Sequence, residues 1–313
     1  MSLSPASPAP CQRSITPLPG NHQRLDGGAM FGNAPRAVWA GWLPPDDQHR
    51  IRMACRGMLV REAPAQGAHH GERRILVETG IGAFFSPEMK ARFGIEEPQH
   101  MLLAHLAEQG LSDADIDVVV LSHLHFDHAG GLLSAWEEGQ APRLLFPKAQ
   151  FVTGRRQWER ALTPHARDRA SYIPEIIALL AASGRLTLVD DAQEGAPVLP
   201  PEGLPADWRL HFSDGHTPGQ MLVEVPMPDG PVVFTGDLVP GLPWVHLPIT
   251  MGYDRFPERV IDEKAALLDD LVARGGRILF THDPEVAVGR LQRDAKGRYG
   301  VSERWGDEAV LST

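Results

Sequence analysis

The sequence predicts an α/β layered domain, and three features of the chain support this fold class. Short runs rich in β-branched residues alternate with stretches of helical periodicity over most of the 313 residues. Residues 117–122 (DVVVLS) are typical of a buried strand, because three successive valines favour the packed environment of a sheet. Residues 257–274 instead have the apolar spacing of a long amphipathic helix. Strands interleaved with helices in this way are typical of layered α/β proteins.

The expected elements follow one another in a regular order. Glycines and one Pro-Asp-Gly turn end most of them, because glycine and proline interrupt regular structure. Loops that carry His and Asp follow several of the buried strands, and α/β proteins usually build their sites at such strand ends. We predict strands at residues 74–78, 117–122, 221–225, 232–235 and 277–281, and helices at residues 99–109, 174–182 and 257–274.

Two parts of the chain are less regular. Residues 1–24 contain five prolines, which disfavour a helix, so we predict an N-terminal arm followed by one domain at residues 25–313. This arm and the segment 27–32 offer contacts for a possible homo-oligomer. Residues 139–214 are interpreted either as an insertion that covers the site or as an ordinary helix-strand part of the core.

Composition and charge exclude several classes of protein. The net charge is −10, and no basic run is present, so a nucleic acid or an anionic membrane surface is a poor partner. Two cysteines make no disulfide framework and are typical of a reducing compartment. No apolar stretch approaches the roughly 20 residues that span a bilayer, and the N-terminus lacks the apolar core of a signal peptide. We therefore expect a soluble, cytoplasmic protein.

Four potential metal ligands, His123, His125, Asp127 and His128, lie within six positions directly after the predicted strand at 117–122. Three imidazoles and a carboxylate do not make a core motif, because polar groups buried without partners cost free energy. Alternate spacing puts His123 and His125 on one side of an extended chain, and a tight turn can direct Asp127 and His128 elsewhere. One short loop can therefore supply two adjacent metal ions.

This segment resembles the HxHxDH motif of the metallo-β-lactamase superfamily. Four further segments resemble motifs of the same family in the same order, and the match in order and intervals extends over roughly residues 27–291. The resemblance implies the four-layer αβ/βα sandwich of that family. These segments are residues 76–82 (LVETGIG, with Glu78 where Asp is usual), 214–219 (DGHTPG), 235–237 (TGD) and 281–283 (THD).

The resemblance also implies a set of metal ligands and a reaction. It implies a hydrolase with two divalent metal ions, Zn(II) first and Mn, Fe or Co as alternatives, because the donors are nitrogen and oxygen without thiolate. A hydroxide that bridges the two metals would attack a small ester, lactone or phosphotriester, with Asp237 and Asp127 as the catalytic carboxylates. The implied ligands are His123, His125 and His216 for one metal, Asp127, His128 and His282 for the other, and Asp237 for both.

Several positions narrow the subclass. Asp237 stands where the true β-lactamases of this family carry Cys, so hydrolysis of β-lactams is not expected. The segment 27–32 (GGAMFG) resembles an early loop of the branch that contains methyl parathion hydrolase and the acyl-homoserine-lactone lactonases. Many of those lactonases place a tyrosine three residues after the bridging Asp, whereas this chain has Pro240. Gln220 stands where the GHTPG segment usually continues with His.

Two other functions remain open as alternatives. One is a thioesterase of the glyoxalase II type, and the other, from a different class, is a non-catalytic metal-binding scaffold. A small-molecule substrate is the partner that we expect. The residues predicted to line its pocket are His246, Trp244, Phe31 and Tyr253.

Overall fold

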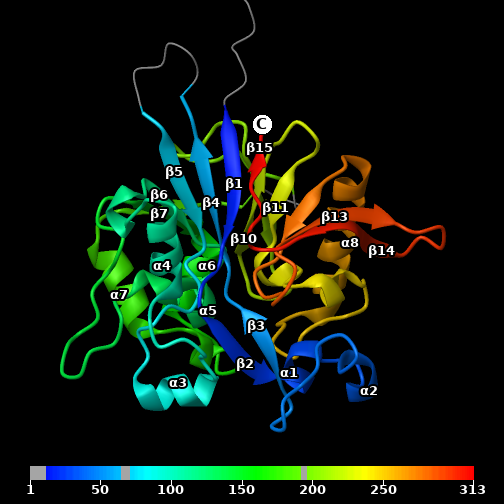
Figure 1. The fold of residues 1–313 in the computed structure, drawn as a ribbon, viewed down its shortest axis with the longest axis horizontal. Coiled ribbons are helices and arrows are strands. Elements are labelled where there is room, and N and C mark those ends of the chain that lie inside the picture. Colours follow the sequence, from blue (N-terminus) through cyan, green and yellow to red (C-terminus); the bar gives the residue numbers. More distant parts are fainter. Residues whose placement is uncertain (1–11, 65–70, 192–195) are drawn as a thin grey trace, which may run out of the picture.

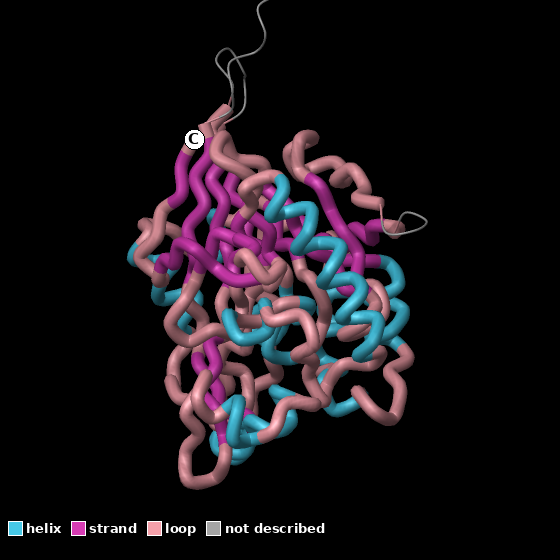
Figure 2. Tube along the Cα trace, turned by 90° about the vertical axis from the view of Figure 1, so that its right-hand side faces the viewer, coloured by secondary structure: helices cyan, strands magenta, loops and turns pink. Residues whose placement is uncertain are grey.

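The computed structural model describes residues 12–64, 71–191 and 196–313, and two β-sheets form its centre. The sheets pack against each other, and helices cover the outer face of each one (Figure 1). This arrangement confirms the predicted four-layer αβ/βα sandwich. In Figure 2 the long helix on one outer face crosses in front of the strands.

The first sheet has seven strands and the second has six. The first contains, in spatial order, β15 (Leu311–Ser312), β1 (Arg13–Leu18), β4 (Gly57–Glu62), β5 (Arg73–Val77), β6 (Val118–Val120), β7 (Gln150–Gly154) and β8 (Leu186–Val189). The second contains β14 (Tyr299–Trp305), β13 (Val288–Arg293), β12 (Arg277–Leu279), β11 (Val232–Phe234), β10 (Gln220–Val225) and β9 (Arg209–Ser213). A separate hairpin pairs β2 (His22–Asp26) with β3 (Arg50–Ala54).

The helices divide between the two outer faces and the loops around the site. Buried side chains of α4 (Met101–Glu108), α6 (Arg155–Leu162) and α7 (Pro174–Ala182) pack on the first sheet, and α8 (Pro257–Ala273) packs on the second. The remaining helices are short: α1 (Gly27–Phe31), α2 (Arg36–Trp39), α3 (Pro87–Phe93) and α5 (Phe126–Ala129).

The central strands are apolar on both faces because each of their faces meets another layer. In β10, Met221 and Val223 join the core between the sheets, whereas Leu222 joins the core beneath α8. In β6, Val119 faces the outer helices, and its neighbours Val118 and Val120 face the other sheet. Each such side chain contributes roughly 1.5–3 kcal/mol when it is fully buried. This two-sided burial explains why the sequence shows continuous apolar runs rather than strict alternation.

The predicted elements occur in the structure with small differences at their ends. The predicted helices are α4, α7 and α8, and the predicted strands are β5, β6, β10, β11 and β12. Strands β6 and β12 end two residues earlier than predicted. Their last predicted residues leave the sheet and begin the loops that carry the site.

The predicted N-terminal arm requires a correction. Strand β1 pairs along its whole length with β4, and Ser14 and Ile15 also pair with β15. Pro17 lies beyond the two-residue strand β15, in a position at the sheet edge where proline is tolerated. The layered domain therefore begins at Arg13 instead of residue 25, while residues 1–11 lie outside the described part of the chain.

The segment 139–214 is mainly an ordinary part of the core. It contributes β7, α6, α7, β8 and β9, and only the stretch around residues 167–171 reaches the cavity described below. Within the described ranges, no helix is both long and apolar enough to cross a membrane.

Candidate metal centre

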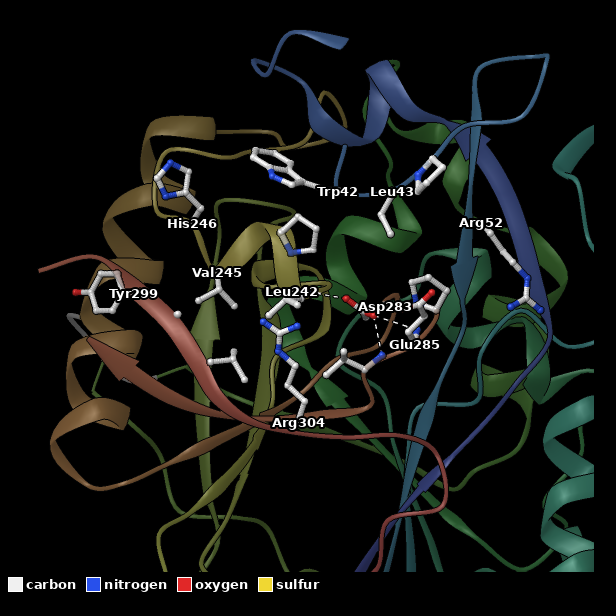
Figure 3. Close-up of a pocket in the computed structure, with 16 residues that line it drawn as sticks. Trp42, Leu43, Arg52, Leu242, Val245, His246, Asp283, Glu285, Tyr299 and Arg304 are labelled. Carbon is white, nitrogen blue, oxygen red and sulfur yellow. Dashed lines mark hydrogen bonds between the residues drawn. The ribbon is translucent and has the colours of Figure 1, made fainter. Parts of the chain in front are cut away.

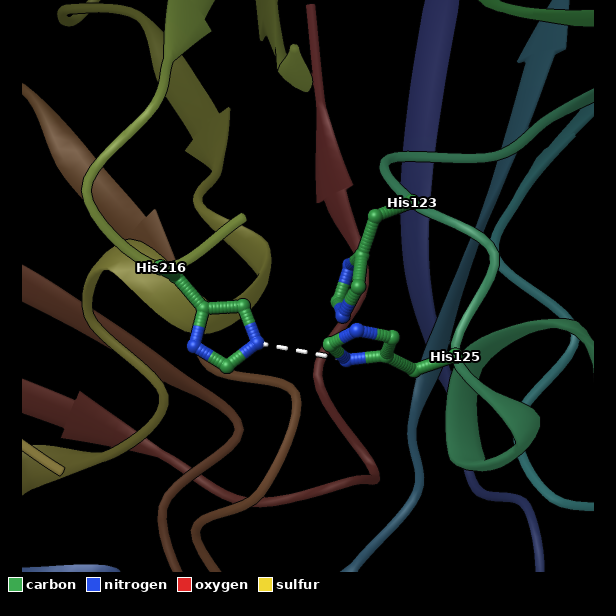
Figure 4. Close-up of side chains that lie close together, drawn as sticks. All are labelled: His123, His125 and His216. Atoms are coloured by element: carbon green, nitrogen blue, oxygen red, sulfur yellow. Dashed lines mark hydrogen bonds between the residues drawn. The ribbon is translucent and has the colours of Figure 1, made fainter. Parts of the chain in front are cut away.

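Loops at the ends of four strands bring seven polar side chains to one place. His123, His125, Asp127 and His128 follow β6 in the first sheet. In the second sheet, His216 lies between β9 and β10, Asp237 lies in the turn after β11, and His282 follows β12. His123 and His125 point toward His216 across the junction of the two halves (Figure 4). The two sheets therefore each supply part of one cluster.

The side chains form two groups of three. His123, His125 and His216 offer ligand atoms within 4.8 Å of one another, and so do Asp127, His128 and His282. The members of each group are buried except Asp127, which is half-buried. This is the same division into two sets that the sequence analysis predicted.

Asp237 lies between the two groups and turns one oxygen toward each. Its Oδ2 lies 3.3 Å from His216 Nε2 and 4.0 Å from His123 Nε2. Its Oδ1 lies 3.1 Å from His282 Nε2 and 3.3 Å from His128 Nε2. Burial acts to raise the pKa of Asp237, but the surrounding imidazoles hold it well below its usual range. The carboxylate is therefore ionised and can bridge two cations.

The outer nitrogen of several rings is held by a hydrogen bond. His216 Nδ1 donates to Asp254 Oδ1 at 2.9 Å, and His282 Nδ1 donates to the carbonyl of Ala54 at 2.7 Å. His123 Nδ1 lies 3.0 Å from Ser122 Oγ. A proton on the outer nitrogen leaves Nε2 as the unprotonated atom that faces the cluster, which is the usual arrangement in metal sites.

The distances between the inward nitrogens fit divalent cations. His125 Nδ1 lies 3.3 Å from His216 Nε2 (Figure 4), and His128 Nε2 lies 3.2 Å from His282 Nε2. Two nitrogens bound tetrahedrally to one zinc ion lie about 3.3 Å apart, given Zn–N distances of about 2.0–2.1 Å. Buried ligand atoms such as His123 Nε2 and Asp237 Oδ1 have no hydrogen-bond partner among the described residues. The donor set therefore fits a metal in both groups.

The electrostatics of the rings agree with this fit. Burial lowers the pKa of His123 and His125 well below its ordinary value, so these imidazoles are neutral. Burial also acts against protonation of His128, His216 and His282, but the carboxylate between them outweighs it and raises the pKa of each ring. The centre of the cluster therefore favours positive charge, as a cation site must.

Two supporting side chains come from the first sheet and the β2–β3 hairpin. Glu78, fully buried at a positive φ of 67°, accepts hydrogen bonds from the backbone N–H of Ser122 and from His128 Nδ1. Gln23, also fully buried, donates from Nε2 to Asp127 Oδ2 at 2.9 Å. In the sequence, Glu78 stands out only as a departure from the family motif, and Gln23 and Asp254 were not predicted as site residues.

A cavity of about 350 Å³ opens over the cluster. Its apolar wall consists of Leu25, Met30, Met53, Phe93, Phe126 and Met251. Its polar lining comprises Arg167, Asp168, Ser171 and Tyr253 together with His125, Asp127, His216, Asp237 and His282. The space above the cluster therefore suits a small, partly apolar molecule.

Of the four residues predicted to line this pocket, only Tyr253 does so. Phe31 turns away from the cavity and stacks on Trp244, with ring centroids 4.5 Å apart, and Trp244 is only 1% exposed. His246 lines a different cavity of about 640 Å³, between the loop at Trp42 and strand β14 (Figure 3). The prediction for Phe31, Trp244 and His246 is therefore wrong, whereas Met30, next to Phe31, lines the cavity over the cluster.

The chain is similar to known proteins in both sequence and fold. Residues 65–282, more than half of the chain, match the family model of the metallo-beta-lactamase superfamily. A crystal structure described as "a probable metal-dependent hydrolase" from Staphylococcus aureus is 26% identical, with a TM-score of 0.77, and the match covers 93% of this chain and 97% of the other.

Two further solved structures share the fold at lower identity. AidC, a dizinc quorum-quenching lactonase in complex with a product, is 18% identical with a TM-score of 0.67, over 96% of this chain and 97% of the other. The hydrolase AbOPH is also 18% identical with a TM-score of 0.67, over 94% of this chain and 95% of the other.

Proposed function

This chain belongs to the metallo-β-lactamase superfamily, and from that premise we propose that it is a dinuclear metal-dependent hydrolase of small esters, lactones or phosphotriesters. One observation carries the proposal. The Asp237 carboxylate turns a separate oxygen toward each of two histidine groups, and the inward nitrogens of each group lie about as far apart as two ligands of one ion.

Each group would hold one divalent ion. His123, His125 and His216 would hold the first, Asp127, His128 and His282 the second, and Asp237 would contact both. Nitrogen and oxygen donors without thiolate favour Zn(II), with Mn, Fe and Co as alternatives. When bound, two such ions lower the pKa of a coordinated water and polarise the scissile carbonyl or phosphoryl group.

The residues of the chain then provide binding, charge and proton transfer. Two divalent ions would carry +4 against −2 from Asp127 and Asp237, so the loaded site would retain positive charge inside a chain of net charge −10. Negative charge that develops on the substrate oxygen is therefore stabilised at this position. We assign to Asp237 the transfer of the proton that the attacking water loses to the leaving oxygen, because its buried Oδ1 has no hydrogen-bond partner in the described part of the chain.

The substrate class rests on the cavity and on the structural neighbours. An apolar wall with three methionines accommodates acyl or aryl groups of different shape. AidC is a lactonase, and another neighbour of 18% identity is an N-acyl homoserine lactone hydrolase with its product bound at the metal centre. We extend these activities to this chain as part of the proposal. Pro240 lacks the phenol of many lactonases, which would lower lactone turnover by on the order of 100-fold if no other donor replaces it.

A substrate panel tests the proposed function. The zinc-loaded protein is assayed with a long-chain homoserine lactone, a paraoxon-like triester, a p-nitrophenyl ester, S-lactoylglutathione and a β-lactam. We expect turnover of the lactone and of the aryl ester or triester, and none of the β-lactam. Turnover of S-lactoylglutathione alone would instead indicate a thioesterase. Absence of all turnover in a sample with full metal content would indicate a scaffold.

A further inference from the structure

Tyr253 is a polar side chain of the cavity that no step of the proposed reaction uses. It lines the cavity together with Asp127, Asp237 and His282, and it is 43% exposed. Ser171 and Tyr253 carry the only hydroxyl groups in the described lining of this cavity. The phenol of Tyr253 makes no hydrogen bond within the described part of the chain. A hydroxyl at this position is therefore free to meet a bound molecule.

The loop that carries Tyr253 is fixed directly to the metal centre. Its next residue, Asp254, accepts from His216 Nδ1 through Oδ1 and from the backbone N–H of Met251 through Oδ2, at 2.9 and 2.7 Å. The residue before it, Gly252, donates its N–H to the carbonyl of Ala29 at 2.8 Å. The backbone at Tyr253 is consequently held at a fixed place relative to His216, as it must be for a residue that positions a substrate.

Arg167, another residue that lines the cavity, also holds the loop that carries Tyr253. Arg167 Nη2 donates to the carbonyl of Gly252 at 2.6 Å, which joins the segment around residues 167–171 to the Tyr253 loop. A side chain added at Gly252 would meet the Ala29 carbonyl at 3.1 Å, so the backbones are also closely packed here. Contacts with Arg167 on one side and with Ala29 on the other therefore hold the loop in place.

The phenol of Tyr253 is protonated at neutral pH. Burial raises the pKa of Tyr253 above its ordinary value, and the carboxylates of Asp127 and Asp26 raise it further. A neutral phenol is a hydrogen-bond donor without a charge of its own. Such a group suits the carbonyl or ring oxygen of a neutral ester or lactone.

We propose that Tyr253 is the substrate-positioning residue of this cavity, and that its hydroxyl donates a hydrogen bond to a carbonyl or ring oxygen of the bound ester or lactone. This inference rests on the proposed function and narrows it. A donor from residue 253 would replace the phenol that Pro240 does not provide. Molecules with a carbonyl or ring oxygen at this position would be preferred over molecules of the same shape without one.

The test uses two ligands that are not hydrolysed and differ in one acceptor. The first is N-hexanoyl-2-aminocyclopentanone, a ketone analogue of N-hexanoyl-homoserine lactone, and the second is N-hexanoyl-cyclopentylamine, which lacks only the ring carbonyl. Calorimetry on the zinc-loaded protein measures the affinity for each. We expect the wild type to prefer the ketone, and Tyr253→Phe to lose about 5-fold of that preference, the usual value of one neutral hydrogen bond.

A matched control removes a phenol elsewhere. Tyr299→Phe deletes a hydroxyl that bonds to Asp269 outside the cavity, so it should leave the preference unchanged. The proposal is overturned if the wild type binds both ligands equally, or if Tyr253→Phe keeps the wild-type preference. A preference that depends on Tyr253 in a protein that hydrolyses nothing in the panel would support this inference and refute the proposed function. Lactone hydrolysis with a higher KM in Tyr253→Phe than in the wild type and in Tyr299→Phe would support both.

Discussion

Replacement of Asp237 by asparagine is expected to lower kcat/KM by at least about 1000-fold on every substrate of the enzyme. The amide has nearly the same shape as the carboxylate, but it has one acceptor oxygen and no charge. It cannot turn an anionic oxygen toward both histidine groups, as Asp237 does at 3.1–3.3 Å from His282, His128 and His216. Metal-based stabilisation of transition-state charge amounts to several kcal/mol, and about 4 kcal/mol corresponds to a 1000-fold change in rate.

The measurement is steady-state kinetics together with metal analysis of the same sample. Asp47→Asn is a suitable control, because Asp47 is exposed on the turn before β3 and is not a member of the metal-binding cluster. It should retain wild-type kinetics. Wild-type activity in a folded Asp237→Asn protein would contradict the role of Asp237 as the carboxylate shared by both groups.

Replacement of Glu78 by glutamine is expected to weaken binding of one metal ion by about 10- to 100-fold. The Glu78 carboxylate accepts from two donors, the N–H of Ser122 and Nδ1 of His128. An amide has one oxygen, so one of these donors must face an N–H₂ group. If that donor is His128, its proton is driven to Nε2, and the ring can no longer bind metal through that atom.

The effect should be selective for the group of Asp127, His128 and His282. Competition with a chelator measures both dissociation constants, and the first site, with His123, His125 and His216, should change little. Glu285→Gln, at an exposed glutamate of the other cavity, serves as the control. Equal weakening of the two sites, or no weakening of either, would show that Glu78 does not orient His128.

The sequence predicted the seven clustered side chains well because their positions depend on local features. Four of them lie in one short segment, and each of the others follows a strand whose apolar run is visible in the sequence. Once a buried strand is placed in its layer, the loop that follows it must leave at the carboxyl end of that strand, where the sites of α/β proteins usually form. The layer arrangement itself followed from the family motifs and their order.

The lining of the cavity could not be predicted in the same way. Met30 and Phe31 are adjacent in the one-turn helix α1, and only the packing of Phe31 on Trp244 decides which of them faces the cavity. Likewise, His246 follows Trp244 by two residues but opens into the separate cavity near Trp42. Such orientations depend on contacts between segments distant in the sequence.

The supporting residues were missed for the same physical reason. Gln23 lies 104 positions from Asp127, and Asp254 lies 38 positions from His216, yet each pair shares a hydrogen bond. No local pattern marks a glutamine in an amphipathic strand as the partner of a distant carboxylate. The pairing of β1 with β4 was not predicted, because the prolines of the N-terminal segment disfavour regular structure and indicated an arm outside the domain.

The metal content of the wild-type protein tests the central claim most directly. The protein is stripped with a chelator, reloaded with excess zinc, dialysed against metal-free buffer and analysed by elemental mass spectrometry, with hydrolytic activity followed in parallel. Two histidine groups that share Asp237 predict close to two zinc ions per chain and a return of activity as the second ion binds. A plateau at one ion or none, with no further uptake when more metal is added, would contradict the dinuclear centre.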